Sequence, residues 1–251
     1  MRTVAMLALA TITLSACDRQ TPAATAPDLT ASLARETENT ANVHRYRVTI
    51  TNLTTGQPMS PGVLATHTKA ASLFAIGALA SNGIRQIAEN GNPASAVSAL
   101  TGADGVYQVV STGAPIGRNV SPTDVFSNSR TVEIDAAANA NFLSLAVMLI
   151  CTNDGFTGFD SVRLPGGFKP EVVDTYAYDA GTEVNDEKAG SIVPPCFGIG
   201  PVKGLVGGNG HMNQNGVIAM HPGIQGNVVG GLTVAHRWSE PVARVEIQRL
   251  K

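Results

Sequence analysis

The chain has 251 residues, of which 43% are hydrophobic and only 14% are charged, and its formal net charge is -2. This composition supplies enough apolar side chains for a sizeable core, so it excludes a chain that is disordered throughout. It also argues against a nucleic-acid partner, because the sequence has no Lys/Arg-rich run with interleaved aromatic residues.

The first 16 residues have the pattern of a secretory signal peptide. A positive start at Met1-Arg2 precedes an apolar run at 3–13, which is too short to span a bilayer by itself. The sequence "LSAC" at 14–17 resembles the lipobox of bacterial lipoproteins, and by that resemblance Cys17 becomes the acylated N-terminus of the mature protein. The other interpretation is an ordinary signal peptide, cleaved nearby, with an incidental cysteine.

These features predict an exported protein of the bacterial cell envelope that a lipid anchors to a membrane without a spanning helix. Residues 17–43 contain the lipidated cysteine and then a segment rich in Thr, Ala and Pro, which predicts a flexible tether. Asp18 resembles an inner-membrane retention signal whose rule varies between bacterial groups, so the choice between inner and outer membrane stays open. Residues 44–251 are predicted to form one folded domain.

The folded domain is predicted to contain many short antiparallel strands. At its start, Tyr46, Val48 and Ile50 alternate with polar residues before the turn signal at 55–58. Gly, Pro, Asn and Asp, rather than long helical patterns, separate the further apolar or alternating runs. These runs lie at 106–111, 130–135, 142–150, 232–238 and 242–250. The order favours an all-β antiparallel sandwich over a parallel α/β sheet.

Two short helices interrupt the strand pattern. Ser81 can cap a helix whose apolar residues have helical spacing and which ends at Gly91, and Pro93 can open a second helix. The run at 142–150 is too short for a membrane span. We interpret it as a buried strand that delivers Asp154 to one end of the fold.

Two cysteines remain in the predicted domain, Cys151 and Cys196. Because exported proteins fold in an oxidising compartment, we predict a disulfide between them. Two free, buried cysteines are the alternative.

Two glycine-containing acidic stretches supply the candidate metal ligands. Calcium takes about six to eight oxygen ligands, which flexible acidic loops can provide. Neither stretch has the EF-hand spacing, so these residues by themselves leave a solvated acidic turn and a calcium site both open. The oxygen-bearing side chains are Asn153, Asp154 and Asp160 in "TNDGFTGFD", and Asp179, Glu183, Asn185 and Asp186 in "YDAGTEVND".

Five segments, in order, carry a family resemblance. They are "YRVTITNLTTGQPMSP" at 46–61, "ASNGIRQIAENGNP" at 80–93, "LSLAVMLICTNDGFTGFDSVRLP" at 143–165, "YDAGTEVNDE" at 178–187 and "PVARVEIQRL" at 241–250. With these segments the chain resembles the spondin N-terminal (F-spondin type) domain, which also occurs in many exported bacterial proteins.

The resemblance implies an eight-stranded antiparallel β-sandwich, similar to calcium-dependent lipid-binding modules, with one Ca²⁺ held by loops at one end. The metal ligands of the family fall on Asp154, Asp179 and Glu183. Glu183 stands where the animal protein has Asp, and its longer side chain can still chelate the ion. The resemblance does not extend to Asp160, Asn185 and Asp186, which remain candidates for groups that support the ligands or bind water.

The sequence favours a non-enzymatic binding or adhesion module. Its five histidines show neither HExxH nor HxH spacing, and it contains no GxSxG elbow and no phosphate-binding loop. A glycan, another envelope protein or a lipid headgroup would fit as the ligand. Two alternatives remain: a polysaccharide-active hydrolase that uses the paired acidic residues, and a structural envelope protein whose ion only stabilises the fold.

Overall fold

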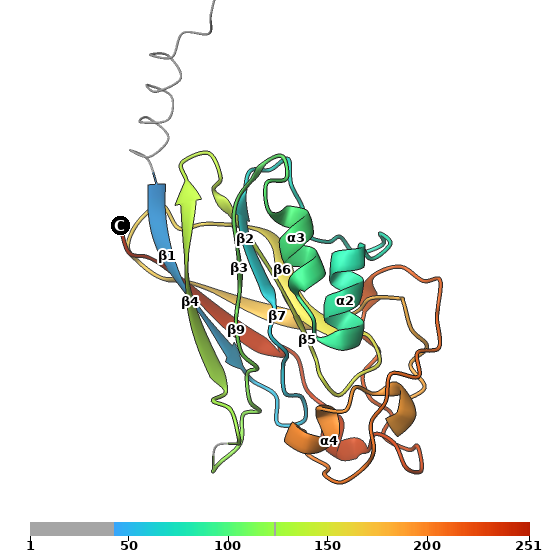
Figure 1. The fold of residues 1–251 in the computed structure, drawn as a ribbon. Helices are drawn as coiled ribbons and strands as arrows, with labels where there is room; N and C mark the ends of the chain where they lie inside the picture. Colours follow the sequence, from blue (N-terminus) through green and yellow to red (C-terminus); the bar gives the residue numbers. More distant parts are fainter. Residues whose placement is uncertain (1–42, 123) are drawn as a thin grey trace, which may run out of the picture. The chain divides into compact units, whose positions relative to one another are not determined.

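The structure is a computed structural model that describes residues 43–122 and 124–251 (Figure 1). The predicted signal peptide at 1–16, the predicted lipidation site Cys17 and the predicted tether up to residue 42 lie outside these residues. Within the described residues, the first strand begins at Val43. No helix in the described ranges is long and apolar enough to cross a membrane.

The described chain is mostly antiparallel β-structure, which confirms the predicted all-β class. Eight strands follow one another across the sheet in the order β3-β2-β5-β6-β7-β9-β1-β4, and a short β8 pairs with β7. The strands are β1 (Val43–Asn52), β2 (Val63–His67), β3 (Val106–Ser111), β4 (Ser129–Ala137), β5 (Phe142–Met148), β6 (Gly155–Arg163), β7 (Glu171–Asp179), β8 (Ala219–Met220) and β9 (Ala243–Arg249). The helices are α2 (Asn82–Asn90), α3 (Ala94–Leu100) and α4 (Cys196–Ile199), with single 3-10 turns η1 (Ala189–Ser191) and η2 (Val234–His236).

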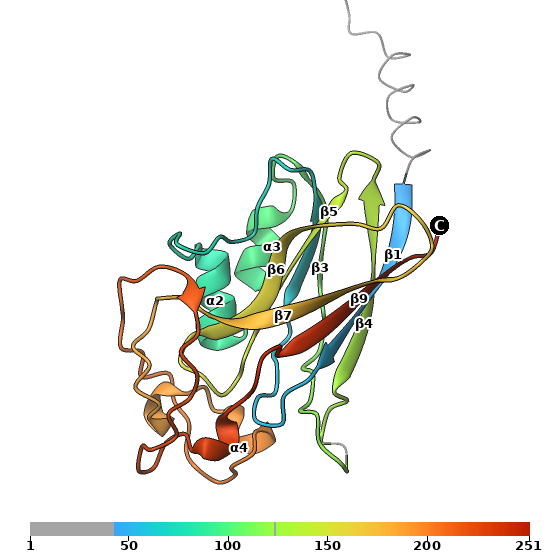
Figure 2. The ribbon, with the colours of Figure 1, turned by 180° about the vertical axis from the view of Figure 1, so that it is seen from behind.

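Strand β7 joins the two halves of the sheet. Its first half, residues 171–175, pairs with β9, whereas its second half, residues 176–179, pairs with β6 (Figure 2). At the far edges, β3 and β4 are bridged by side chains: Gln108 accepts a hydrogen bond from the Asp135 amide, and Arg130 Nε donates to the Thr112 carbonyl at 2.8 Å. The sheet is therefore nearly closed, like a barrel or a sandwich.

Strand β5 is buried on both faces, which explains its unbroken apolar sequence. Leu145 and Val147 point into a core formed with β1 and β9, while Ala146 and Met148 point into a second core under the helices. The predicted buried strand at 142–150 is therefore present, although it ends at Met148.

Helix α2 has the predicted boundaries because both caps are local. The Ser81 hydroxyl accepts a hydrogen bond from the Ile84 amide, and Gly91 ends the helix in the left-handed region. Ile84 and Ile87 are fully buried against the second core, so helical spacing places both on the sheet side. Helix α3 follows directly after Pro93, as predicted.

The predicted strand at 232–238 is wrong. The Thr233 side chain instead accepts a hydrogen bond from the Ala235 amide, and the His236 ring accepts one from the Thr233 amide at 2.9 Å. These local bonds close the 3-10 turn η2, since they satisfy backbone groups that a strand would have offered to a neighbour. The pattern of apolar and alternating runs also failed to predict β2, β6, β7 and the short β8.

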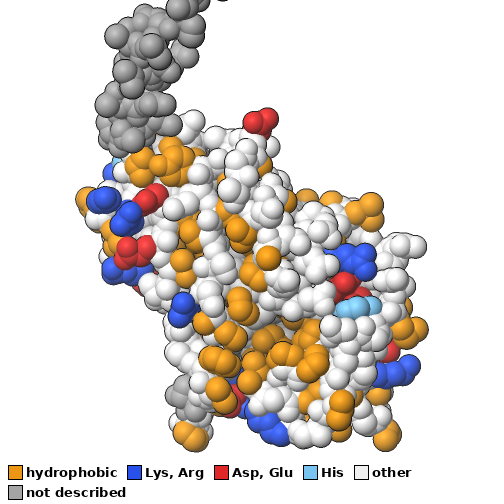
Figure 3. Space-filling view, in the orientation of Figure 1, with side chains coloured by type: hydrophobic (Ala, Val, Ile, Leu, Met, Phe, Trp, Pro, Cys, Tyr) orange, Lys and Arg blue, Asp and Glu red, His pale blue; other side chains and the backbone are white. Residues whose placement is uncertain are grey.

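The outer face of β1 and β4 carries cross-strand ion pairs between arginine and acidic side chains. Arg45 pairs with Asp135 at 2.8 Å, and Arg47 pairs with Glu133 at 3.1 Å. Basic and acidic side chains accordingly lie side by side over these strands in Figure 3. Exposed pairs of this kind contribute little to stability, but they keep an edge strand charged.

Candidate metal centre

Two acidic loops meet where β6 begins and β7 ends. Asp154 directly precedes β6, and Gly155 pairs with Asp179 across the β6–β7 ladder. The Ala180 amide also donates a 3.1 Å hydrogen bond to the Asp154 carbonyl. Strand register therefore places Asp154 and Asp179 side by side, although 24 residues separate them in sequence.

The Asp154 carboxylate is fully buried and only half satisfied. Its Oδ2 accepts hydrogen bonds from the Thr182 amide at 2.7 Å, the Glu183 amide at 2.9 Å and the Thr182 hydroxyl at 3.2 Å. Its Oδ1 has no hydrogen-bond partner among the described residues. Asp154 thus holds the second loop by one oxygen, while the other accepts no hydrogen bond from the described residues.

Asp179 shapes the loop that follows it. Its Oδ1 accepts a 2.6 Å hydrogen bond from the Gly181 amide, and its Oδ2 accepts one from the Asn185 amide group at 2.5 Å. Gly181 has φ +70°, and a Cβ there would lie 2.6 Å from the Val217 carbonyl oxygen. Only glycine fits this tight turn.

Glu183 is fully buried, and neither of its carboxylate oxygens has a hydrogen-bond partner within the described part of the chain. Its Oε1 lies in contact with Nδ1 of His211. Glu89 of α2 lies on the same side, with one ligand atom from each of the three residues within 4.8 Å of the others. Arg85 donates a 2.8 Å hydrogen bond to Glu89.

The loops concentrate negative charge out of contact with water. Burial, followed by the Glu89 and Asp154 carboxylates, raises the pKa of Glu183 to about 8. Burial, followed by Asp179, raises the pKa of Asp154 to about 6, against the opposing hydrogen bonds from Thr182 and Glu183. A cation at this position would offset the repulsion and favour the ionised carboxylates.

The other residues of the acidic stretches have different roles. Asn185 holds Asp179, and Asp186 accepts a 3.1 Å hydrogen bond from the side chain of Asn153. Asp160 lies elsewhere, since its carboxylate binds the Leu73 amide and the Ser144 hydroxyl. Asn185 and Asp186 therefore support the loops around the predicted ligands, whereas Asp160 does not.

Sequence reasoning did not single out Glu89 or His211 as candidate ligands. Glu89 falls in a short amphipathic helix and is 2% exposed. No sequence motif indicates that its carboxylate lies near Glu183. His211 comes from the long loop before β8. The Val184 amide donates a 2.8 Å hydrogen bond to the Met212 carbonyl, and this backbone contact brings the two loops together.

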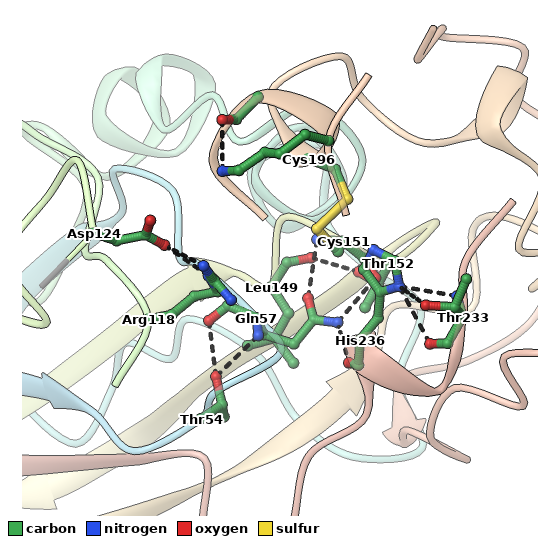
Figure 4. The surroundings of a disulfide bond; sticks show 12 residues. Thr54, Gln57, Arg118, Asp124, Leu149, Cys151, Thr152, Cys196, Thr233 and His236 are labelled. Carbon is green, nitrogen blue, oxygen red and sulfur yellow. Dashed lines mark hydrogen bonds and ion pairs between the residues drawn. A yellow bond between two sulfur atoms is a disulfide. The ribbon is translucent and has the colours of Figure 1, made fainter. Parts of the chain in front are cut away.

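A disulfide braces the turn that presents Asp154. Cys151 and Cys196 are joined, with sulfur atoms 2.12 Å apart, so the turn after β5 is tied to α4 (Figure 4). The Gln57 side chain accepts a 2.9 Å hydrogen bond from the Cys151 amide and donates to the Cys151 carbonyl at 3.0 Å. It also donates to the His236 carbonyl at 2.7 Å. These bonds and the disulfide hold Cys151 three residues before the acidic site.

A family model described as Spondin_N matches residues 51–187, more than half of the chain. The chain belongs to the spondin N-terminal family. The matched region contains Asp154, Asp179, Glu183 and Glu89 but ends before His211. No curated protein matches the chain. Spondin N-terminal domains are non-catalytic modules found in secreted or extracellular proteins, which agrees with the predicted export.

A cleft lined by both polar residues and the apolar residues Leu79 and Ala80 lies beside the acidic loops of this spondin-type domain. It has a volume of about 440 Å³ and includes the backbone of Gly181 and Thr182. Arg85 and Asn213 line it from the two facing elements, and they are joined by a 3.2 Å hydrogen bond. Gln214 and Asn215 add further amide groups. Amides and a guanidinium can donate to hydroxyls or carboxylates of a ligand.

Proposed function

We propose that this spondin-type domain binds one calcium ion through Asp154, Asp179 and Glu183 and acts as a non-enzymatic binding module. The observation that carries the proposal is a set of three buried carboxylate oxygens that accept no hydrogen bond from the described residues: Oδ1 of Asp154 and both oxygens of Glu183, of which Oε1 contacts Nδ1 of His211. Buried charges in proteins are normally paired or coordinate a metal. A cation held between the two loops would supply positive charge to these buried carboxylates.

The residues present fit calcium. Carboxylate oxygens from loops are its usual ligands, and several more oxygens can come from backbone carbonyls and water. Asp179 already accepts two hydrogen bonds, yet each of its oxygens keeps a further lone pair. When bound, the ion would supply positive charge that holds the loop at 179–187 against the start of β6.

The cleft beside this loop supports a polar ligand such as a glycan. Thr182 belongs to both features, because its amide and hydroxyl hold Asp154 while the residue lines the cleft. Ordering of the loop by calcium would therefore also order one wall of the cleft. We propose that calcium controls ligand binding in this way.

We also propose that the mature protein is anchored to a membrane of the bacterial cell envelope through lipidated Cys17. Support comes from the "LSAC" sequence after an apolar run. In detergent phase separation of cells that express the full chain, we expect the wild type in the detergent phase. Cys17→Ser should move to the aqueous phase, and an unchanged distribution would contradict lipidation.

Calorimetric titration with calcium tests the metal proposal. The wild type should bind one ion, and Asp154→Asn should lose that binding while keeping its circular-dichroism spectrum. Asp104→Asn is the matched control, because Asp104 is exposed in a turn after α3. A wild-type protein that gives no calcium heat, or an Asp154→Asn variant that binds as the wild type does, would refute the proposal.

A glycan array with and without calcium tests the binding function. Retention that requires calcium and yields no released sugar supports a binding module. Sugar release would instead identify a hydrolase. Stabilisation by calcium with no retained ligand would identify a structural ion. A ligand present at a free concentration of 100 times its Kd should stabilise the fold by about 2.7 kcal/mol. A shift in melting temperature therefore reports on the binding of calcium and on the binding of a glycan.

A further inference from the structure

Glu89, Glu183 and His211 form a cluster that the calcium proposal does not use fully. The three come from different elements: Glu89 from α2, Glu183 from the loop after β7 and His211 from the loop before β8. Each offers one ligand atom, and these atoms lie within 4.8 Å of one another. Such spacing is compatible with three ligands around one ion, for which metal–ligand distances are about 2.0 to 2.2 Å.

The cluster is buried and contains unpartnered polar atoms. Glu183 is fully buried and Glu89 is 2% exposed, so two carboxylates face each other away from water. Both Glu183 oxygens and Nδ1 of His211 have no hydrogen-bond partner in the described ranges. Arg85 neutralises Glu89 in part through its 2.8 Å bond, but it does not contact Glu183 in the described hydrogen bonds. When Glu183 is ionised, its charge therefore has no partner in these hydrogen bonds, and His211 is the group in contact with it.

The backbone holds the three ligand-bearing elements in place. Glu183 forms a β-bridge with Asn213, two residues after His211. Arg85 reaches across from α2 and donates a 3.2 Å hydrogen bond to the side chain of Asn213. These contacts set the His211 loop against both acidic residues through the protein's own backbone and side chains.

We propose that Glu89, Glu183 and His211 bind a transition-metal ion of the zinc class, at a site separate from the calcium ligands Asp154 and Asp179. The donor set decides the class of ion. One imidazole nitrogen with two carboxylates suits Zn²⁺, whereas calcium prefers oxygen ligands alone. Glu183 belongs to both proposals, since its Oε1 contacts His211 and its Oε2 accepts no hydrogen bond from the described residues. Water would complete the zinc coordination.

His211 lies outside the segment that the family model matches, because the matched region ends at residue 187. A nitrogen ligand added from this loop converts an acidic pair into a mixed site. The competing explanation is an ion pair between protonated His211 and Glu183 that binds no metal.

Titration with Zn²⁺, with Co²⁺ as a spectroscopic substitute, tests the proposal on the purified domain. Bound Co²⁺ should show visible absorption that zinc abolishes. His211→Ala and Glu89→Gln should each weaken Zn²⁺ binding by at least about 10- to 100-fold, since loss of even an indirect partner of a metal ligand costs that much. Both variants should keep calcium binding. His44→Ala, in β1, is the matched histidine control.

The calcium proposal and the zinc-class proposal can be refuted independently of each other. Asp154→Asn should lose calcium binding and keep the Co²⁺ spectrum, the reverse of His211→Ala. Glu183→Gln should weaken both. No Co²⁺ or Zn²⁺ binding by the wild type, or equal Zn²⁺ affinity in His211→Ala, overturns the zinc-class site and leaves only the ion pair. Zinc binding without calcium heat would instead refute the calcium proposal alone.

Discussion

Glu183→Gln isolates the energetic consequence of the buried carboxylate. In metal-free protein, burial and neighbouring acids raise the pKa of Glu183 from 4.5 to about 8. Between these two pH values the folded state binds a proton that the unfolded state releases. Stability must therefore fall as pH rises through this window. Glutamine keeps the shape but has no proton to lose, so the variant should lack this slope.

The size of the effect follows from the shift in pKa. Since one pKa unit corresponds to about 1.4 kcal/mol, ionisation of Glu183 destabilises the metal-free fold on the order of 3 kcal/mol at about pH 7. From about pH 5 to about pH 8, the wild type should lose roughly 3 kcal/mol relative to Glu183→Gln. At about pH 5 the two should differ little. A bound cation should reduce the wild-type slope, because it stabilises the ionised carboxylate.

Urea unfolding in a chelator, at several pH values, measures this difference. Burial lowers the pKa values of His221 and His236, which adds an opposite slope at acid pH in both proteins, so only the difference between the curves is compared. Glu171→Gln is the control, because Glu171 is exposed at the start of β7. Parallel curves for the wild type and Glu183→Gln would refute a buried, uncompensated carboxylate.

Three further changes test the scaffold. Replacing both Cys151 and Cys196 by Ser opens a loop of 45 residues and should lower the unfolding free energy, measured by denaturant titration, by about 4 kcal/mol. An unchanged unfolding free energy would mean that the disulfide does not constrain the unfolded chain. Gly181→Ala should lower the unfolding free energy by more than about 1 kcal/mol and weaken calcium binding measured by calorimetry, because φ is +70° and the Val217 carbonyl blocks a Cβ. Unchanged stability and calcium affinity would contradict the tight turn. Leu145→Ala, in the β1–β9 core, should cost about 2 to 5 kcal/mol by thermal unfolding, and a change below about 1 kcal/mol would contradict its full burial.

Local sequence was sufficient where the physical cause is local. Ser81 and Gly91 delimit α2, since a side-chain cap and a left-handed glycine satisfy the free backbone groups of the same turn. The apolar run at 142–150 gave a buried strand because hardly any polar side chain in it could face water. The glycine-containing acidic loops were likewise recognisable as places that gather oxygen ligands.

The local sequence pattern led to a wrong prediction where two local structures compete. The run at 232–238 alternates like a strand, yet the Thr233 and His236 side chains bond to nearby backbone and close a turn. Strands β6 and β7 carry glycine and polar residues. Their identity as strands depends on partners distant in sequence, which composition does not encode.

The sequence by itself determined the all-β class, the short helices, the paired cysteines and the acidic loops at the ends of strands. Only the tertiary structure decided that β7 divides its pairing between β9 and β6, which fixes Asp179 beside Asp154. It alone brought Glu89 and His211 to Glu183, across a helix and two loops. The reason is that periodicity and capping act within a few residues, whereas strand register and loop packing depend on contacts over the whole chain.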